Sequence, residues 1–160
     1  MAVMNFKAAH LDPSDGTTMI PDSWYLTANF TDRSNVCEEL DYRNQLPSET
    51  AAGISLTRKD GEQITPGTYA VSALSEGDKA TGVTAKGWVY KSDDKCKSQL
   101  ATDDAFAKSG SVTITKVTKT ELVGTFELTF ASGSLKGTFT APFCREFNIS
   151  EIQASFTCFP

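Results

Sequence analysis

The chain has 160 residues, of which 39% are hydrophobic and 22% charged, a balance typical of a folded domain rather than of a disordered chain. No apolar run is long enough to cross a bilayer as a helix, and the formal charge of -5 comes without the basic stripe expected of a nucleic-acid-binding protein. We therefore expect one soluble domain over residues 1–160, with no nucleic-acid partner and no transmembrane segment.

The first third of the chain predicts two strands and one short helix. Apolar and polar side chains alternate over residues 2–9 and again over residues 24–30, as they do in strands with one buried face. Ser34 or Asn35 can cap a helix of two or three turns that ends before Pro47.

The middle of the chain predicts three further strands and a long loop. Two strands begin at residues 54–56 and 69–71, and each lies next to a turn that contains glycine. A third strand covers residues 82–90. Residues 92–109 are polar and predict a loop, with a single helical turn over residues 103–108.

The last part of the chain predicts a three-stranded antiparallel meander over residues 110–143, followed by a strand over residues 152–159. Phe and Leu occupy one side of the meander and Thr the other, a pattern typical of a sheet with one solvated face. The predicted core comprises Trp24, Leu26, Phe30, Ile54, Leu56, Ile114, Phe126, Leu128, Phe130, Leu135 and Phe139.

Eight or nine short strands with one minor helix predict an all-β fold. We expect an antiparallel β-sandwich of the jelly-roll or immunoglobulin-like type, with a closed barrel as the alternative. The chain contains no internal repeat and no linker that would divide it.

Several turn and strand segments carry a family resemblance: TDRSNVC at 31–37, ITPGTY at 64–69, GSVTIT at 110–115, GTFELTF at 124–130 and GTFTAPFC at 137–144. With these segments, residues 24–144 resemble an uncharacterised family of small secreted proteins and lipoproteins of predatory soil bacteria, the myxobacteria among them. The resemblance implies export and no known activity. The chain differs from that family in lacking a leader with a lipid-attachment Cys and in extending to a further cysteine, Cys158.

The four cysteines are scattered without a C-x-x-C pair, which argues against zinc and against a thioredoxin-type motif. Such an even set predicts disulfides, with buried free thiols as the alternative, and hence an extracellular, periplasmic or cell-surface location. Met1 to Lys7 is too short and too polar for a signal peptide, so we expect that a leader has been removed.

Four cysteines allow three pairings, and strand counting provides the only guide. If successive strands alternate in direction, Cys37 and Cys144 lie at one end of the sandwich and Cys96 and Cys158 at the other. We therefore predict Cys37 bonded to Cys144 and Cys96 bonded to Cys158. The rival pairing is Cys37 to Cys96 with Cys144 to Cys158.

The strand over residues 82–90 carries the candidate binding site. If its valines and Ala85 face the core, then Trp88, Tyr90 and Lys86 face outward, where exposed aromatic rings can stack on sugars. Tyr25 is a weaker companion. The opposite phase, with Trp88 and Tyr90 in the core, fits the alternation equally well.

The sequence offers no catalytic site and no cofactor motif. His10 is the only histidine, which leaves little basis for a triad, although a hydrolase that uses loop carboxylates is the alternative function. Acidic pairs in the loops could supply calcium with oxygen ligands, but the EF-hand signature is missing and a solvated loop is the simpler interpretation. We expect no metal site.

Threonines on the outer side of the meander could form a flat array of methyl and hydroxyl groups, as in ice-binding surfaces. Thr is also a common residue on the solvated side of any sheet. The main expectation is therefore a secreted or surface-attached binding or structural module, with carbohydrate or another protein as its partner.

Overall fold

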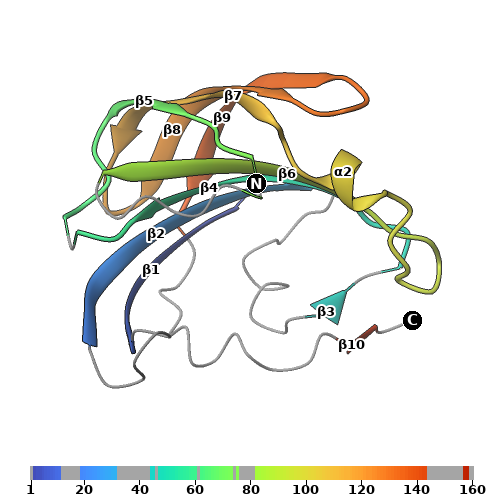
Figure 1. The fold of residues 1–160 in the computed structure, drawn as a ribbon, viewed down its shortest axis with the longest axis horizontal. Helices are drawn as coiled ribbons and strands as arrows, with labels where there is room; N and C mark the ends of the chain where they lie inside the picture. Colours follow the sequence, from blue (N-terminus) through green and yellow to red (C-terminus); the bar gives the residue numbers. More distant parts are fainter. Residues whose placement is uncertain are drawn as a thin grey trace.

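The computed structural model describes residues 2–11, 19–31, 44–45, 47–60, 62–73, 75, 82–143 and 157–158. Two antiparallel sheets form a sandwich, shown as two layers in Figure 1. The N-terminal sheet has the strand order β1 (Ala2–Leu11), β2 (Met19–Thr31), β4 (Thr50–Arg58) and β6 (Val83–Lys91). The C-terminal sheet has the order β5 (Gly67–Ala70), β7 (Ser109–Val117), β8 (Glu121–Thr129) and β9 (Ser134–Pro142).

Three short elements complete the described part. The helix α2 (Thr102–Ala105) lies within the long loop after β6, close to where a helical turn was predicted. The strands β3 (Asn44–Gln45) and β10 (Thr157–Cys158) pair in parallel. Figure 1 shows them on the side of the N-terminal sheet that faces away from the C-terminal sheet.

The predicted sandwich is confirmed, and the described residues do not form the closed barrel that was its alternative. The predicted strands also form, with β2 beginning five residues earlier than expected. The helix predicted to begin at Ser34 or Asn35 falls on residues that the structure does not describe. Of the predicted strand over 152–159, only Thr157 and Cys158 lie among the described residues.

The phase of the meander is as predicted. In β8, Leu122, Gly124 and Leu128 are buried while Thr125, Glu127 and Thr129 are exposed. Strand β9 follows the same rule with Phe139 and Ala141 buried. A period of two places alternate side chains on opposite faces, so the Phe and Leu side of these strands forms one wall of the core.

The core lies between the two sheets. Seven of its predicted members are buried, namely Leu26, Ile54, Leu56, Ile114, Leu128, Phe130 and Phe139. Phe30, Phe126 and Leu135 are only partly buried but pack against the core, and the side chain of Trp24 lies outside the described ones. Phe30 joins the layers, because its ring stacks on Phe126 at 5.1 Å between centroids and lies 5.5 Å from Phe139.

Gly87 shows which side of β6 faces the core. A Cβ at Gly87 would lie 2.7 Å from two methyl carbons of Leu128 in the opposite sheet, so the two sheets are in close contact here. Ala85 is fully buried, and Val83 and Val89 pack against the core. The even-numbered residues of β6 therefore lie on the outer face of the N-terminal sheet.

Candidate functional site

The outer face of β6 carries three of the four predicted site residues. Lys86, Trp88 and Tyr90 are half-buried and lie opposite Ser55, Gly53 and Ala51 of β4, respectively. This arrangement selects one of the two phases that the sequence left open, since the valines and Ala85 occupy the core. We call these three residues together with Phe106 the β6 face.

Trp88 occupies the centre of the β6 face. Its indole lies directly over Gly53, so that a Cβ at Gly53 would overlap Cε2 and Cζ2 of the ring and lie 2.7 Å from Nε1. Glycine at this position therefore creates the space in which the ring lies. An aromatic side chain covering a glycine on the next strand is a known way to stabilise a sheet, so Trp88 has a structural role besides any contact with a ligand.

Phe106 is a member of the β6 face that the sequence did not reveal. An isolated antiparallel bridge pairs it with Trp88, and partners across such a pair point to the same side of the sheet. The amide of Ala107 donates to the carbonyl of Gly87 over 2.9 Å and holds this segment along β6. The signal in the sequence was a single Phe between alanines within a polar loop, too brief to predict a strand.

Tyr90 is tied to the loop that follows β6. Its hydroxyl donates to the carbonyl of Cys96 over 3.4 Å. The polar edge of this ring thus has a partner within the protein, and Tyr90 presents mainly its ring to the surface.

The side chain of Tyr25 lies outside the described ones, and the register of its backbone puts it away from Trp88. The row of Trp88 continues through Gly53 to Asn29, whereas Tyr25 is opposite Thr57, four residues along β2 from Asn29. At about 3.3 Å for each residue this separation is roughly 13 Å along the strand. The structure therefore groups Trp88, Tyr90 and Lys86 and leaves Tyr25 outside the group.

The outer face is not uniformly open. Thr84 is 1% exposed, and Asn29 and Thr57 are each 9% exposed, although all three lie on the outer face by their register. Partly buried side chains occupy the rest of the described outer face, among them Thr27, Ser55, Lys86, Trp88, Tyr90 and Phe106. The β6 face is thus the part of this surface that carries aromatic rings.

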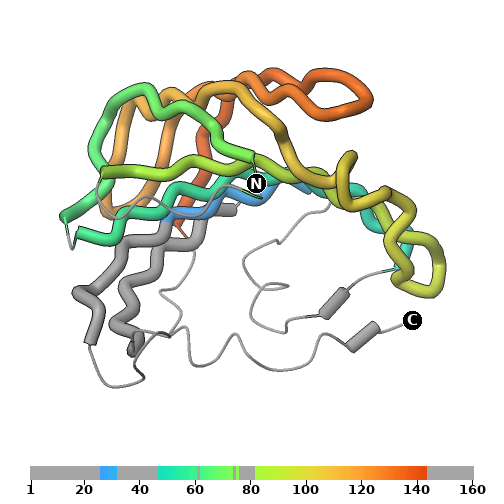
Figure 2. Tube along the Cα trace, viewed as in Figure 1, coloured from blue at the N-terminus to red at the C-terminus, as the bar shows by residue number. Residues whose placement is uncertain are grey.

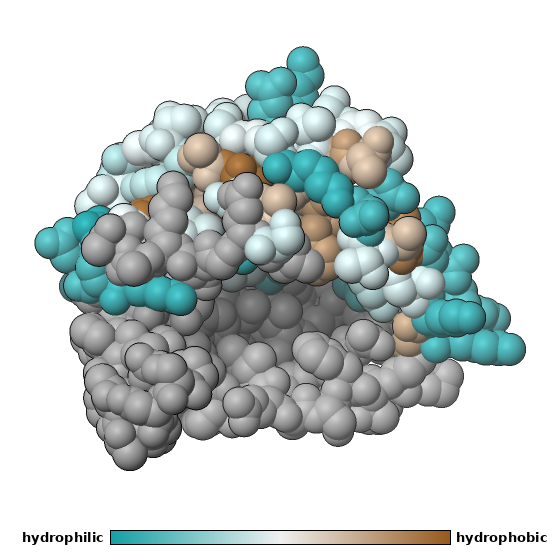
Figure 3. Space-filling model, in the orientation of Figure 1, coloured by the Kyte–Doolittle hydropathy of each residue, from teal (hydrophilic) through white to brown (hydrophobic). Residues whose placement is uncertain are grey.

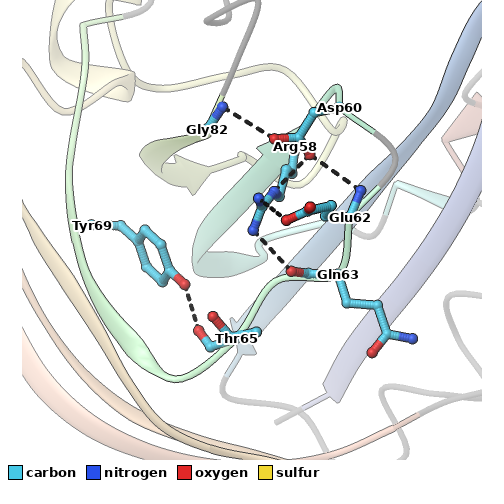
Figure 4. Close-up of polar contacts among 7 residues, drawn as sticks. All are labelled: Arg58, Asp60, Glu62, Gln63, Thr65, Tyr69 and Gly82. Carbon is cyan, nitrogen blue, oxygen red and sulfur yellow. Dashed lines mark hydrogen bonds and ion pairs between the residues drawn. The ribbon is translucent and has the colours of Figure 1, made fainter.

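A charged cluster at the end of β4 gathers two of the loop carboxylates (Figure 4). Nε of Arg58 donates to Asp60 over 2.6 Å, and its terminal nitrogens reach the Glu62 carboxylate and the Gln63 carbonyl. The hydrogen bond from Arg58 lowers the pKa of Asp60, and the same bond raises the pKa of Arg58. Asp60 also accepts from the amide of Gly82, so the cluster joins the loop after β4 to the start of β6.

This cluster is a structural ion-pair network that connects two segments, and it differs from the carboxylate pair of a catalytic acid and base. Catalysis by two carboxylates needs one acid with a raised pKa, and Asp60 is shifted the other way. Asp103 behaves similarly, because its hydrogen bond with Lys108, 2.8 Å long, lowers its pKa. Asp60 and Asp103 are therefore each held in the ionised form by a neighbouring cation.

The acidic loop after β6 is organised by one carboxylate. Oδ1 of Asp93 accepts from the amides of Lys95 and Lys97 at 2.9 and 2.8 Å, and Oδ2 accepts from the Gln99 side chain. These bonds use the oxygens that a calcium ion would need. Among the residues that the structure describes, no group of three acidic, His or Cys side chains is arranged to hold a metal.

Threonines form a continuous row across the C-terminal sheet. Thr68, Thr113, Thr125 and Thr138 are successive register partners on β5, β7, β8 and β9, and the Thr68 and Thr113 hydroxyls lie 2.9 Å apart. Glu127 and Lys136 form a pair in the next row and interrupt the array. The described surface in Figure 3 is mostly white to teal with small brown patches. The row alone does not identify a ligand, and ice binding stays a prediction.

The strand count behind the disulfide prediction was wrong at one step. Strands β2 and β6 are both antiparallel to β4 and therefore run in the same direction, with Thr31, Ala51 and Tyr90 in one row. The strands that precede Cys37 and Cys96 thus end at the same edge of the sheet rather than at opposite ends. The cause is β5, which counts as a strand along the chain but lies in the other sheet.

Cys96 is disulfide-bonded, and its partner lies outside the described side chains, so no bond is complete within the part of the chain that is described. The predicted pairing is therefore not decided by Cys96 alone.

No family model matches the chain, and neither a curated protein nor a solved structure is significantly similar to it. The resemblance to secreted proteins of soil bacteria therefore stays a prediction. None of the described helices has the length and apolar character needed to span a membrane.

Proposed function

We propose that the protein is a non-catalytic binding module, exported or attached to the cell surface, and that the β6 face binds carbohydrate through Trp88. The observation that carries the proposal is the position of Trp88, which is only partly buried on the outer face of a sheet whose inner face is already filled by a core. An aromatic ring outside the core can offer its face to the apolar side of a sugar ring.

The neighbours of Trp88 support a site rather than an isolated ring. Phe106 on one side and the backbone of Gly53 on the other fix its position in the sheet. The hydroxyl of Tyr90 is hydrogen-bonded to the carbonyl of Cys96. A second aromatic ring, two residues along β6 from Trp88 and on the same face, is therefore also held in place. Preformed aromatic surfaces lose little side-chain entropy on binding, which favours weakly interacting ligands such as glycans.

Export is supported by the disulfide at Cys96, because disulfides persist mainly in oxidising environments. Lipid attachment is a finer expectation that rests on the family resemblance alone. The hydrolase alternative stays a prediction, since the clusters of Arg58 with Asp60 and of Lys108 with Asp103 hold their carboxylates in ion pairs.

The experiment is a glycan array followed by titration calorimetry on the best ligand. Trp88→Leu keeps apolar bulk over Gly53 but removes the aromatic face, and we expect at least tenfold weaker binding, equivalent to about 1.4 kcal/mol. Trp88→Phe should retain part of the affinity. Thr125→Ala, on the outer face of the other sheet, is the matched control and should leave binding unchanged.

Two results would contradict the proposal. If no glycan binds the wild-type protein, carbohydrate is not the ligand and a protein partner becomes the better candidate. If a glycan binds and the Trp88→Leu variant binds it equally well while remaining folded, the class of function is right but the site lies elsewhere.

A further inference from the structure

Asn29 is a buried polar residue on the outer face of the N-terminal sheet. It is 9% exposed, and within the described part of the chain no hydrogen bond involves its carboxamide. Buried polar side chains are nearly always hydrogen-bonded, because an unpaired polar group costs free energy. Ser92, for comparison, is also buried, and its hydroxyl accepts from the amide of Glu49. The carboxamide of Asn29 is therefore not explained by the stability of the sheet.

The neighbours of Asn29 are the two residues at the centre of the β6 face. Asn29 is the register partner of Gly53, which in turn is the register partner of Trp88. Figure 2 shows the blue segment of β2 beside β4 and β6. Side chains in one such row point to the same face of the sheet. Because Gly53 has no side chain, none stands between the carboxamide and the indole in this row.

The indole of Trp88 reaches over Gly53 toward Asn29. Its Nε1 lies 2.7 Å from the position that a Cβ on Gly53 would take. From there the strand that carries Asn29 is about 4.8 Å away. The indole N–H, like the carboxamide, makes no hydrogen bond among the described residues. A donor on Trp88 and a carboxamide on β2 are thus one strand spacing apart, and neither is bonded to a described group.

A hydroxyl group fits between these two side chains. Two hydrogen bonds of about 2.8 Å through one oxygen atom span up to roughly 5 Å, which matches the spacing of neighbouring strands. The oxygen can accept from the indole N–H and donate to Oδ1 of Asn29, while Nδ2 donates to a second oxygen. Because Oδ1 and Nδ2 belong to one carboxamide, the second oxygen has to lie on the neighbouring carbon of the ligand.

Further hydroxyl groups line one side of this row. Thr27 and Ser55 are register partners in the next row of the same face, and both are partly buried. Neither hydroxyl takes part in a hydrogen bond within the part of the chain that the structure describes. Two residues along a strand span roughly 7 Å, so this row is within reach of the edge of a sugar ring that lies on Trp88.

We propose that Asn29 determines which sugars the β6 face binds, because its carboxamide pairs with two neighbouring free hydroxyl groups of the sugar ring on Trp88. This role rests on the proposed function, since it assigns the polar part of the same site. It also accounts for an amide at a position where an apolar residue of similar size would avoid the cost of an unpaired polar group. The ligand class is a glycan whose sugar residues keep two neighbouring free hydroxyls.

NMR titration of the isotope-labelled protein with cellohexaose and with laminarihexaose tests the proposal. Each internal residue of cellohexaose keeps two neighbouring free hydroxyls, whereas the linkage in laminarihexaose occupies the carbon between free hydroxyls and leaves no such pair. We expect cellohexaose to shift the signals of the Trp88 indole N–H and of the Asn29 side-chain amide. It should also bind at least tenfold more tightly than laminarihexaose. The Trp88 signal is distinguished from that of Trp24 by its loss in Trp88→Leu.

Asn29→Leu removes the carboxamide and keeps its bulk. We expect at least tenfold weaker binding of cellohexaose and no remaining preference over laminarihexaose. The melting temperature should equal or exceed that of wild type, because an unpaired buried amide has been removed. Thr57→Val is the matched control, since Thr57 is also 9% exposed on this face but lies four residues from Gly53 along β4. It should leave the binding of cellohexaose unchanged.

An Asn29→Leu variant that keeps the preference for cellohexaose, or that melts below wild type, would overturn the proposal, because Asn29 would then have a structural role only. If cellohexaose shifts the Trp88 signal and not that of Asn29, the aromatic site is retained and the role of Asn29 is wrong. If neither oligosaccharide binds, the role of Asn29 is also wrong, and the glycan array with Trp88→Leu decides the proposed function separately.

Discussion

The indole of Trp88 lies directly over Gly53, its register partner on the neighbouring strand. The ring and the glycine form one structural unit, because any side chain on residue 53 would occupy the space of the ring. The pair therefore decides both the stability of the N-terminal sheet and the orientation of the aromatic group that we propose as the centre of the site.

Replacing Gly53 by Ala should displace the Trp88 ring. Since the added Cβ would overlap the indole, we expect loss of about 1–3 kcal/mol of unfolding free energy and a shift in Trp fluorescence. Chemical denaturation with fluorescence detection measures both. Gly133→Ala, in the turn between β8 and β9 where nothing lies within 4 Å of an added Cβ, is the control and should change neither.

Phe139 should contribute more to stability than Phe126. Phe139 is 3% exposed within the core, and its replacement by Ala should cost about 3–5 kcal/mol through lost burial and a cavity. Phe126 is only partly buried, so Phe126→Ala should cost less. Urea denaturation measures the loss of unfolding free energy in each variant. Equal losses would contradict the prediction that the better-buried ring contributes more to stability.

The Arg58–Asp60 pair should make stability depend on pH. The pKa of Asp60 is lowered in the folded protein, first by its hydrogen bond with Arg58, so its contribution is fully present above the unfolded pKa of about 3.9. This contribution is lost as the pH falls through the folded pKa. We therefore expect Asp60→Asn to be less stable than wild type at pH 6, with the difference shrinking as the pH falls through the lowered folded pKa.

Thermal melts of both proteins between pH 2 and pH 7 measure this difference. Glu127→Gln, an exposed carboxylate on the opposite sheet, serves as the control for the general effect of removing one charge. A constant gap between wild type and Asp60→Asn across the whole range would show that the carboxylate acts through its shape and not through its charge.

Asp93 should hold the loop after β6 in its conformation. Asp93→Ala removes the acceptor for the amides of Lys95 and Lys97, so their hydrogen exchange should accelerate by at least tenfold. The neighbouring Asp94 is exposed and provides the matched control. Unchanged protection in Asp93→Ala would assign the order of the loop to other contacts, the disulfide first among them.

The alternation of side chains was enough to predict most of the architecture. Phe and Leu alternating with Thr at period two determined the meander and its phase. The phase of β6 was settled by the burial of Ala85 and the packing of its valines against the core. A strand whose small residues and large aromatic residues alternate fits either phase from sequence alone. Only the opposite sheet, through Leu128 against Gly87, distinguishes them.

Other features depend on contacts between distant segments and leave no local pattern. The bridge between Trp88 and Phe106 joins a strand to a loop, and the bridge between Val71 and Ala85 joins the residue after β5 to β6. The strand count failed because β5 belongs to the second sheet, and chain order does not reveal which sheet a short strand will join. These are relationships of topology, and periodicity carries no information about them.

The path of the chain between the sheets also bears on how the protein folds. The chain leaves the N-terminal sheet after β4, contributes β5 to the C-terminal sheet, returns for β6 and leaves again for β7. Register partners such as Thr68 and Thr113 are consequently far apart in the sequence, and neither sheet can be completed before the chain has crossed over. High contact order of this kind slows folding to milliseconds or seconds. Because one core joins the two sheets, both should melt in one transition.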